Sequence, residues 1–179
     1  MREKRVVSRT KPRSNGQTNG QTNGHANGHA RGVVGMDELT GVWNRAGFVA
    51  AATPMFISCQ RRESPIALAY FDFDAADDAP SADQAATIDR ILMTMAGQLR
   101  KSFRASDVVG RVDTYRFAVL LTDCTDEALA AVDGVRALSD NLSSLSGLTL
   151  TAGMVRSASG TLEDLMLDAD KKMKELKTA

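Results

Sequence analysis

The part of this sequence that we expect to fold contains no histidine. Both histidines, His25 and His29, lie in a repetitive segment near the N-terminus. Without histidine, Ser-His-Asp catalysis, Cys-His catalysis and most zinc sites are excluded. The two cysteines, Cys59 and Cys124, do not have the spacing of a metal site. We predict that both are buried free thiols in a protein kept in a reducing compartment.

Long apolar runs are also missing from the sequence. No run approaches the roughly 18 residues that a membrane-spanning helix requires. The basic N-terminus lacks the apolar segment of a secretory signal. These absences predict a soluble cytoplasmic protein that does not engage a membrane.

Charge is distributed unevenly along the chain. Residues 1–36 contain seven Arg or Lys and one Glu, which leaves 22 − 7 = 15 basic and 22 − 1 = 21 acidic residues for the remainder. Residues 14–32 form an Asn-Gly repeat with no large apolar side chain, so they cannot bury enough surface to offset chain entropy. We predict a disordered basic tail over 1–36, solvated rather than bound to nucleic acid or lipid, and one acidic folded domain over 37–179.

The folded part alternates between helical and strand-like patterns. Helices are expected at 44–62, 82–103, 125–142 and 161–176, and strands at 66–74, 107–112, 115–121 and 148–156. The core order is strand, helix, strand, strand, helix, strand, with a helix at each end. This order predicts an α+β, ferredoxin-like (βαββαβ) fold with an antiparallel central sheet and helices packed on one face.

Five segments resemble, in order, the motifs of the GGDEF domains of bacterial diguanylate cyclases. They are DELTGVWNRAGF (37–48), AYFDFD (69–74), DRILMTMAGQL (89–99), RASDVVGR (104–111) and ADKKMKELK (169–177). Five matches in register are far more specific than any one of them. The resemblance implies a nucleotide-cyclase palm, which is a ferredoxin-like fold with extra N- and C-terminal helices.

The family's signature turn, Gly-Gly-Asp/Glu-Glu-Phe, falls on 113–117, which read DTYRF. The resemblance implies that Asp72 and an acid in this turn would hold the magnesium with which the family joins two GTP molecules. Tyr115 and Arg116 stand where the turn has its acids, and Arg116 would repel a cation. We therefore predict a degenerate domain that is not an enzyme, with no catalytic residue, no metal site and no cofactor. We also expect Arg116 to pair with Asp72 in place of the metal.

Other family contacts to GTP are changed as well. The loop lysine and the guanine-reading asparagine correspond to Asp77 and Pro80, whereas the guanine-reading aspartate is kept as Asp89. Lys177 corresponds to the family's late phosphate-binding lysine. A vestigial nucleotide site is expected at Asp72, Asp89 and Arg116.

A second family site, marked by R-x-x-D, corresponds to Arg104 and Asp107. The resemblance implies that this pair binds cyclic di-GMP, with Arg136 as a third contact. Arginine offers a fork of donors to phosphate or guanine, and a carboxylate accepts from guanine. The alternative for Arg104 and Asp107 is a plain i, i+3 ion pair at a helix end.

The sequence therefore leaves two functions open. One is a non-catalytic cyclic di-GMP receptor. The other is a nucleotide-independent module that forms a homodimer or regulates a partner signalling protein. Nucleic acid is not expected as a partner, because the acidic domain lacks the aromatic-rich strands of an RNA-binding sheet.

Overall fold

The computed structural model describes residues 35–75, 81–146, 148–157 and 159–178. Residues 1–34 of the predicted tail and the segment that contains Asp77 and Pro80 lie outside these ranges. The described residues form β1 (Trp43–Asn44), α1 (Arg45–Arg61), β2 (Ile66–Ala75), α2 (Ala82–Ser102), β3 (Val108–Asp113), β4 (Arg116–Leu121), α3 (Asp126–Ser146), β5 (Leu148–Ser157) and α4 (Leu162–Thr178). The predicted α+β class and every predicted element are confirmed.

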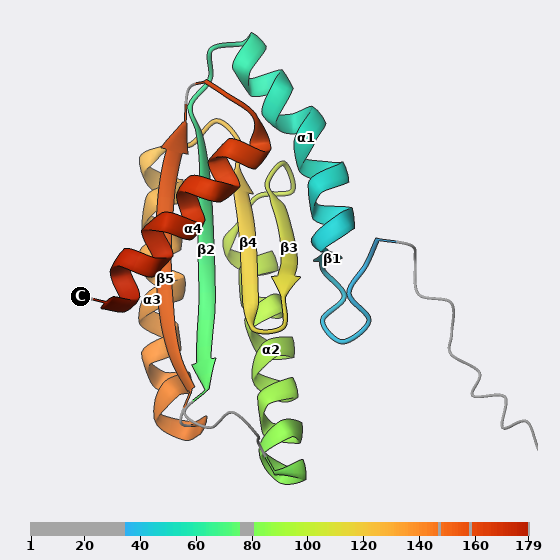
Figure 1. Cartoon of the computed structure of the whole chain (residues 1–179), viewed down its shortest axis with the longest axis vertical. Coiled ribbons are helices and arrows are strands. Elements are labelled where there is room, and N and C mark those ends of the chain that lie inside the picture. The colour runs from blue at the N-terminus through green and yellow to red at the C-terminus, as the bar shows by residue number, and fades with distance from the viewer. Residues whose placement is uncertain (1–34, 76–80, 147, 158, 179) are drawn as a thin grey trace, which may run out of the picture. The chain divides into compact units, whose positions relative to one another are not determined.

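The strands form one sheet in the order β1-β3-β4-β2-β5 (Figure 1). Pairing is antiparallel between β2 and β4, β2 and β5, and β3 and β4, as predicted. The short strand β1 was not predicted, because two residues carry no periodic signal. It pairs in parallel with β3, with Trp43 opposite Gly110 and Asn44 opposite Arg111.

The prediction that helices cover one face of the sheet holds for the two helices of the βαββαβ core, α2 and α3, but the outer helices α1 and α4 pack on the other face. Figure 1 shows α4 on one side of the sheet and α2 and α3 on the other. The cause is the central strand β2, whose residues are apolar at both parities, so both faces must be shielded from water. Ala67, Ala69, Phe71 and Phe73 join the core beneath α2 and α3. Ile66, Leu68 and Tyr70 join the core beneath α1 and α4.

The chain before α1 is fixed by local contacts. The Asn44 side chain caps α1 by accepting a hydrogen bond from the Gly47 N–H at 2.9 Å. Gly47 has no side chain to obstruct the incoming segment, and a Cβ there would lie 2.0 Å from the Gly35 carbonyl oxygen. This close approach brings the residues just before β1 against the start of α1.

Helix α2 begins at a capping box. The Ser81 hydroxyl accepts from the Gln84 N–H, and the Gln84 side chain accepts from the Ser81 N–H. Its buried face ends at Leu99, next to the loop that carries Arg104. The cap and the buried face together fix where that loop begins.

Both cysteines are buried free thiols, as predicted. Cys59 lies on the buried face of α1, and Cys124 follows β4. Burial raises the pKa of the Cys124 thiol, which keeps it protonated at neutral pH. Among the described residues, no helix is long and apolar enough to cross a membrane.

Candidate functional site

Arg116 and Asp72 are cross-strand neighbours on β4 and β2. Arg116 Nη2 lies 2.6 Å and Nε 3.1 Å from Asp72 Oδ2, and Nη1 lies 2.7 Å from Asp170 Oδ1 on α4. The guanidinium also lies over the Tyr70 ring, 5.3 Å from its centroid. The predicted ion pair is therefore present, and it holds a carboxylate whose residue is only 7% exposed.

A second cation reaches the same carboxylate from the last turn of α4. Lys177 Nζ lies 2.9 Å from Asp72 Oδ2 and also donates to Asp74 Oδ1. Burial lowers the pKa of Lys177, but hydrogen bonds to Asp74 and Asp72 outweigh it and raise the pKa overall. The balance at Arg116 is similar: burial lowers its pKa, but Asp72 and Asp170 outweigh this effect and raise the pKa overall. Both side chains stay charged at neutral pH.

This arrangement does not fit a divalent cation. Asp72 and Asp74 offer the hard oxygens that magnesium prefers. However, Asp72 Oδ2 already accepts from Arg116 and Lys177, whose positive charges would repel a metal ion. Across the described ranges, no group of three or more His, Cys, Asp or Glu side chains is arranged to hold a metal.

The turn between β3 and β4 is held by the chain itself. The Thr114 N–H donates to Asp113 Oδ1 at 2.8 Å, and the Phe73 N–H donates to the Tyr115 carbonyl at 2.9 Å. Arg111 Nη2 donates to the Thr114 carbonyl at 2.6 Å. The turn is therefore tied both to the end of β2 and to its own β3 strand.

Arg111 also ties this turn to the segment before β1. Its Nη1 lies 3.2 Å from Asp37 Oδ1, and the Thr40 N–H donates to the same oxygen at 2.9 Å. Burial raises the pKa of Asp37, but hydrogen bonds from Thr40 and the charge of Arg111 outweigh it and lower the pKa. The first and fourth matched segments thus meet through one partly buried ion pair.

Asp89 does not join this cluster. It is exposed on α2, and no hydrogen bond or ion pair within the described part of the chain links it to Asp72 or Arg116. Lys177 joins the cluster instead. Its family match pointed to a phosphate contact, and nothing in the sequence showed that it would reach Asp72.

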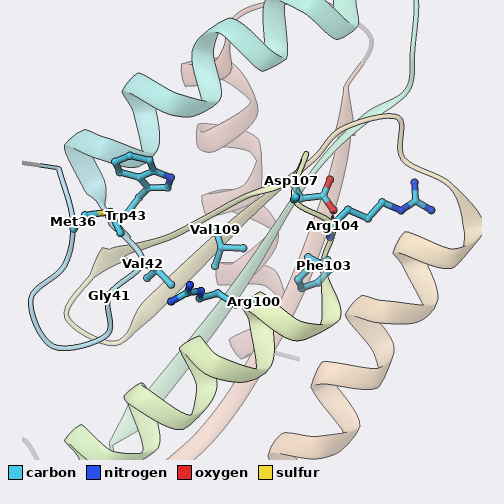
Figure 2. Close-up of a pocket in the computed structure, with 10 residues that line it drawn as sticks. Met36, Gly41, Val42, Trp43, Arg100, Phe103, Arg104, Asp107 and Val109 are labelled. Atoms are coloured by element: carbon cyan, nitrogen blue, oxygen red, sulfur yellow. Dashed lines mark hydrogen bonds between the residues drawn. The ribbon is translucent and has the colours of Figure 1, made fainter. Parts of the chain in front are cut away.

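The loop that carries Arg104 and Asp107 does not contain the plain i, i+3 ion pair. Asp107 Oδ2 accepts from the Arg104 N–H, and Oδ1 accepts from the Thr122 N–H, each at 3.0 Å. The Arg104 guanidinium turns to α3, where Nη2 lies 2.7 Å from Glu127 Oε2 (Figure 2). Helix α2 ends at Ser102, so helical spacing no longer applies at Arg104.

A cavity of about 350 Å³ lies beside this loop (Figure 2). Its lining comes from the segment around β1, the end of α2, the Arg104 loop and β3. The charged lining residues are Arg100, Arg104 and Asp107. Of these, Arg100 was missed at the sequence level, because it belongs to no matched motif.

Arg136 lies in a different place from the other two predicted ligand residues. It lines a cavity of about 390 Å³ between α3, β5 and α4, and it pairs with Asp133 at 3.6 Å. The structure therefore does not bring Arg136 into the cavity beside Arg104. The α3 residue that does reach Arg104 is Glu127, in the first turn of the helix.

Comparison with known proteins identifies the family. Residues 34–179 match the family described as "Diguanylate cyclase, GGDEF domain". The chain therefore belongs to the GGDEF family.

Solved structures of GGDEF domains share the fold. The FimX GGDEF domain from Pseudomonas aeruginosa is 24% identical, with 80% of this chain and 94% of that chain covered and a TM-score of 0.68. The GGDEF domain of DgcB from Caulobacter crescentus, in complex with c-di-GMP, is 15% identical, with 84% and 94% covered and a TM-score of 0.67. Diguanylate cyclase SiaD from Pseudomonas aeruginosa, in complex with its activator SiaC, is 23% identical, with 80% and 58% covered and a TM-score of 0.65. The predicted palm fold is confirmed.

Proposed function

We propose that this chain is a degenerate GGDEF domain that does not make cyclic di-GMP and instead binds it beside Arg104 and Asp107. The observation that carries the loss of synthesis is the pairing of Asp72 with both Arg116 and Lys177, at 2.6 and 2.9 Å. Joining two nucleotides at a phosphate requires divalent cations to neutralise charge, and these contacts take the oxygen that a cation would need. The proposal gives the chain no catalytic residue and no cofactor.

The turn residues support the same conclusion. Tyr115 and Arg116 stand where the family signature has its acids. A phenol is a poor magnesium ligand at neutral pH. Two like unit charges about 4 Å apart cost roughly 4 kcal/mol at an effective dielectric near 20. Since about 1.4 kcal/mol corresponds to a factor of ten, magnesium affinity should fall more than a hundredfold.

The receptor half of the proposal is supported by the cavity beside the Arg104 loop. Its volume of about 350 Å³ and its charged rim suit part of a nucleotide ligand. The similarly folded DgcB domain was solved in complex with c-di-GMP. The proposal places the domain in the cytoplasm, where GTP and the dinucleotides made from it are available.

The direct test uses the full chain in two assays. The protein is incubated with GTP and magnesium or manganese, and the nucleotides are separated by chromatography. Calorimetric titration with cyclic di-GMP then follows, on wild type and on Arg104→Ala. We expect no cyclic product, saturable binding to wild type, and weaker binding to the variant. Cyclic product from wild type would overturn the inactive half, and absence of binding heat would overturn the receptor half.

A second candidate is a nucleotide-independent interaction module that forms a homodimer or regulates a partner signalling protein. Its support is that Arg104 and Asp107 already have internal partners, namely Glu127 and the Thr122 N–H. Each can stabilise the loop without any ligand. SiaD, a related protein, was solved with its activator SiaC. Titration that gives no heat, together with self-association in light scattering, would favour this candidate.

A further inference from the structure

We infer that Arg100 is a second ligand-contacting cation in the cavity beside Arg104, and that it binds one phosphate of the cyclic dinucleotide. The inference rests on the proposed receptor function. It adds a residue outside the R-x-x-D pair and assigns different roles to the two members of that pair.

Arg100 lies in the last turn of α2 and lines the cavity. Figure 2 shows its side chain extending toward Val42 and Val109, whereas the Arg104 side chain extends the opposite way, toward the start of α3. Both residues line the cavity, and their side chains extend away from each other. A ligand in the cavity that contacts both guanidinium groups would have to span the lining residues between them.

Arg100 is also the cation at this site that has no partner within the described part of the chain. Its guanidinium makes no hydrogen bond or ion pair there, whereas Arg104 is held by Glu127 and Thr125. A basic residue at a helix C-terminus is often explained by the helix dipole alone. Lys101, the next residue, supplies that charge without lining the cavity. Arg100 is exposed and lines the cavity, so its guanidinium is available to a ligand there.

The floor between the two cations is apolar. Val42 and Phe103 are buried, and Val109 is partly buried against the core. An apolar floor suits the face of a purine base, and an arginine suits a phosphate, to which it can donate two parallel hydrogen bonds. A cyclic dinucleotide carries its two phosphates on opposite sides of one ring. A nucleoside triphosphate carries its charge at one end, so two separated cations favour the cyclic ligand.

Asp107 takes a different role in this arrangement. Both of its carboxylate oxygens accept backbone N–H groups, from Arg104 and from Thr122. It is therefore a positioning residue that shapes the loop, while Arg100 and Arg104 supply the binding charge. The ligand should accordingly be held mainly through its phosphates, and binding should weaken as salt is added.

The test is calorimetric titration of cyclic di-GMP into the full chain at low and at moderate salt. Four proteins are compared: wild type, Arg100→Ala, Arg104→Ala and the matched control Arg90→Ala. Arg90 is an exposed arginine on the same helix that lies outside the cavity. Loss of a charge-assisted hydrogen bond is typically about 1.5–3 kcal/mol, so we expect Arg100→Ala to weaken binding at least about tenfold.

The remaining outcomes separate this inference from the receptor proposal. Arg90→Ala should bind as wild type does, and Arg100→Lys should recover part of the lost affinity by restoring the charge without the donor fork. The salt dependence of binding should be smaller for Arg100→Ala than for wild type. If wild type binds, Arg104→Ala is weakened and Arg100→Ala matches Arg90→Ala, the inference is wrong and the receptor proposal stands. If wild type does not bind, both are wrong.

Discussion

Arg116 and Asp72 face each other across β4 and β2, with Nη2 of the arginine 2.6 Å from Oδ2 of the aspartate. The contact joins a turn-end residue to the end of the central strand, and Lys177 and Asp170 of α4 complete the cluster. Under our proposal, the chain supplies from its own side chains the positive charge that a metal would otherwise bring to Asp72. This substitution has consequences that can be measured.

Removing Arg116 should destabilise the fold. Arg116→Ala leaves the buried Asp72 carboxylate with only Lys177 as a charged partner. It also removes the arginine that pairs with the Asp170 carboxylate. We expect a loss of about 2 kcal/mol in the free energy of unfolding, measured by urea denaturation. Lys171→Ala is the matched control, because Lys171 pairs with Asp168 on the exposed side of α4, where solvent screening makes an ion pair contribute little to stability. Equal stability of the two variants would contradict the role of Arg116.

Exchanging the two cations for an acid should create metal dependence. The double variant Arg116→Glu with Lys177→Ala brings a new carboxylate beside Asp72 and Asp170 and removes both positive charges. It should melt below wild type without metal, because like charges then repel. Millimolar magnesium or manganese should raise its melting temperature and leave wild type unchanged.

The control for this experiment is Arg116→Gln with Lys177→Ala, which removes the same cations and adds no carboxylate. Its melting temperature should rise less with metal than that of the Arg116→Glu double variant, because it offers one carboxylate fewer. If manganese raises the melting temperature of neither double variant, the cations do not stand in for a metal.

The pair formed by Arg111 and Asp37 predicts a loss of stability in acid. The folded pKa of Asp37 lies below its ordinary value of 3.8, because hydrogen bonds from Thr40 and the charge of Arg111 outweigh the effect of burial. The stability that this carboxylate contributes to the fold is therefore fully present above about pH 4 and is lost as pH falls through the folded pKa.

At neutral pH, Asp37→Asn should cost about 2 kcal/mol, since a charged group that accepts two or more hydrogen bonds is replaced by a neutral one. The difference from wild type should shrink as denaturation is repeated below about pH 4. A difference that stays constant over that range would show that the carboxylate charge does not stabilise the fold.

The sequence predicted the elements well, because the pattern of each one is local. The apolar run of β2 and the helical spacing of Leu92, Met95 and Leu99 in α2 indicate their structures without knowledge of their neighbours. It was less informative about which side chains meet. Lys177 reaches Asp72 across 105 positions, and no local pattern records that contact.

The Arg104 loop shows the same limit. The motif spacing identified Arg104 and Asp107, but it could not show that the carboxylate would bond to the backbone, or that the guanidinium would turn to Glu127. Arg136 was placed beside them by family position alone, and the orientation of α3 directs it to another cavity. Side-chain direction at the end of an element depends on where the helix stops, which is the least certain feature of a sequence-based prediction.

Burial of Tyr70 predicts a loss of stability in alkali. Burial is the main cause that raises the pKa of Tyr70 to about 12, Asp170 raises it further, and Arg116 and Arg45 oppose the rise. Its ordinary value is 10.0. The stability that the buried Tyr70 phenol contributes is therefore fully present below about pH 10 and is lost as the pH rises through about 12.

The protein has two tyrosines, so Tyr115→Phe leaves Tyr70 as the phenol that reports ionisation. In this variant the near-ultraviolet absorbance of phenolate should appear close to pH 12 in the folded protein and close to 10 in urea. A step close to 10 without denaturant would mean that the phenol is not shielded.

Glu127 should compete with a ligand for Arg104. Its carboxylate lies 2.7 Å from Arg104 Nη2, on side chains that are 85% and 48% exposed. A phosphate that binds Arg104 must displace this carboxylate, so removing its charge should tighten binding of cyclic di-GMP. Exposed ion pairs contribute up to about 1 kcal/mol, which sets the expected gain for Glu127→Gln at no more than about fivefold.

Asp126→Asn is the matched control for Glu127→Gln. Asp126 lies in the same first turn of α3, and its loss changes the charge at the helix N-terminus equally without freeing Arg104. Any general effect of charge on ligand attraction therefore acts on both variants, and the gain specific to Glu127→Gln measures the release of Arg104. In an Arg104→Ala background that specific gain should vanish, because the carboxylate then has no guanidinium to occupy. A gain that persists there would show that Glu127 repels the ligand directly.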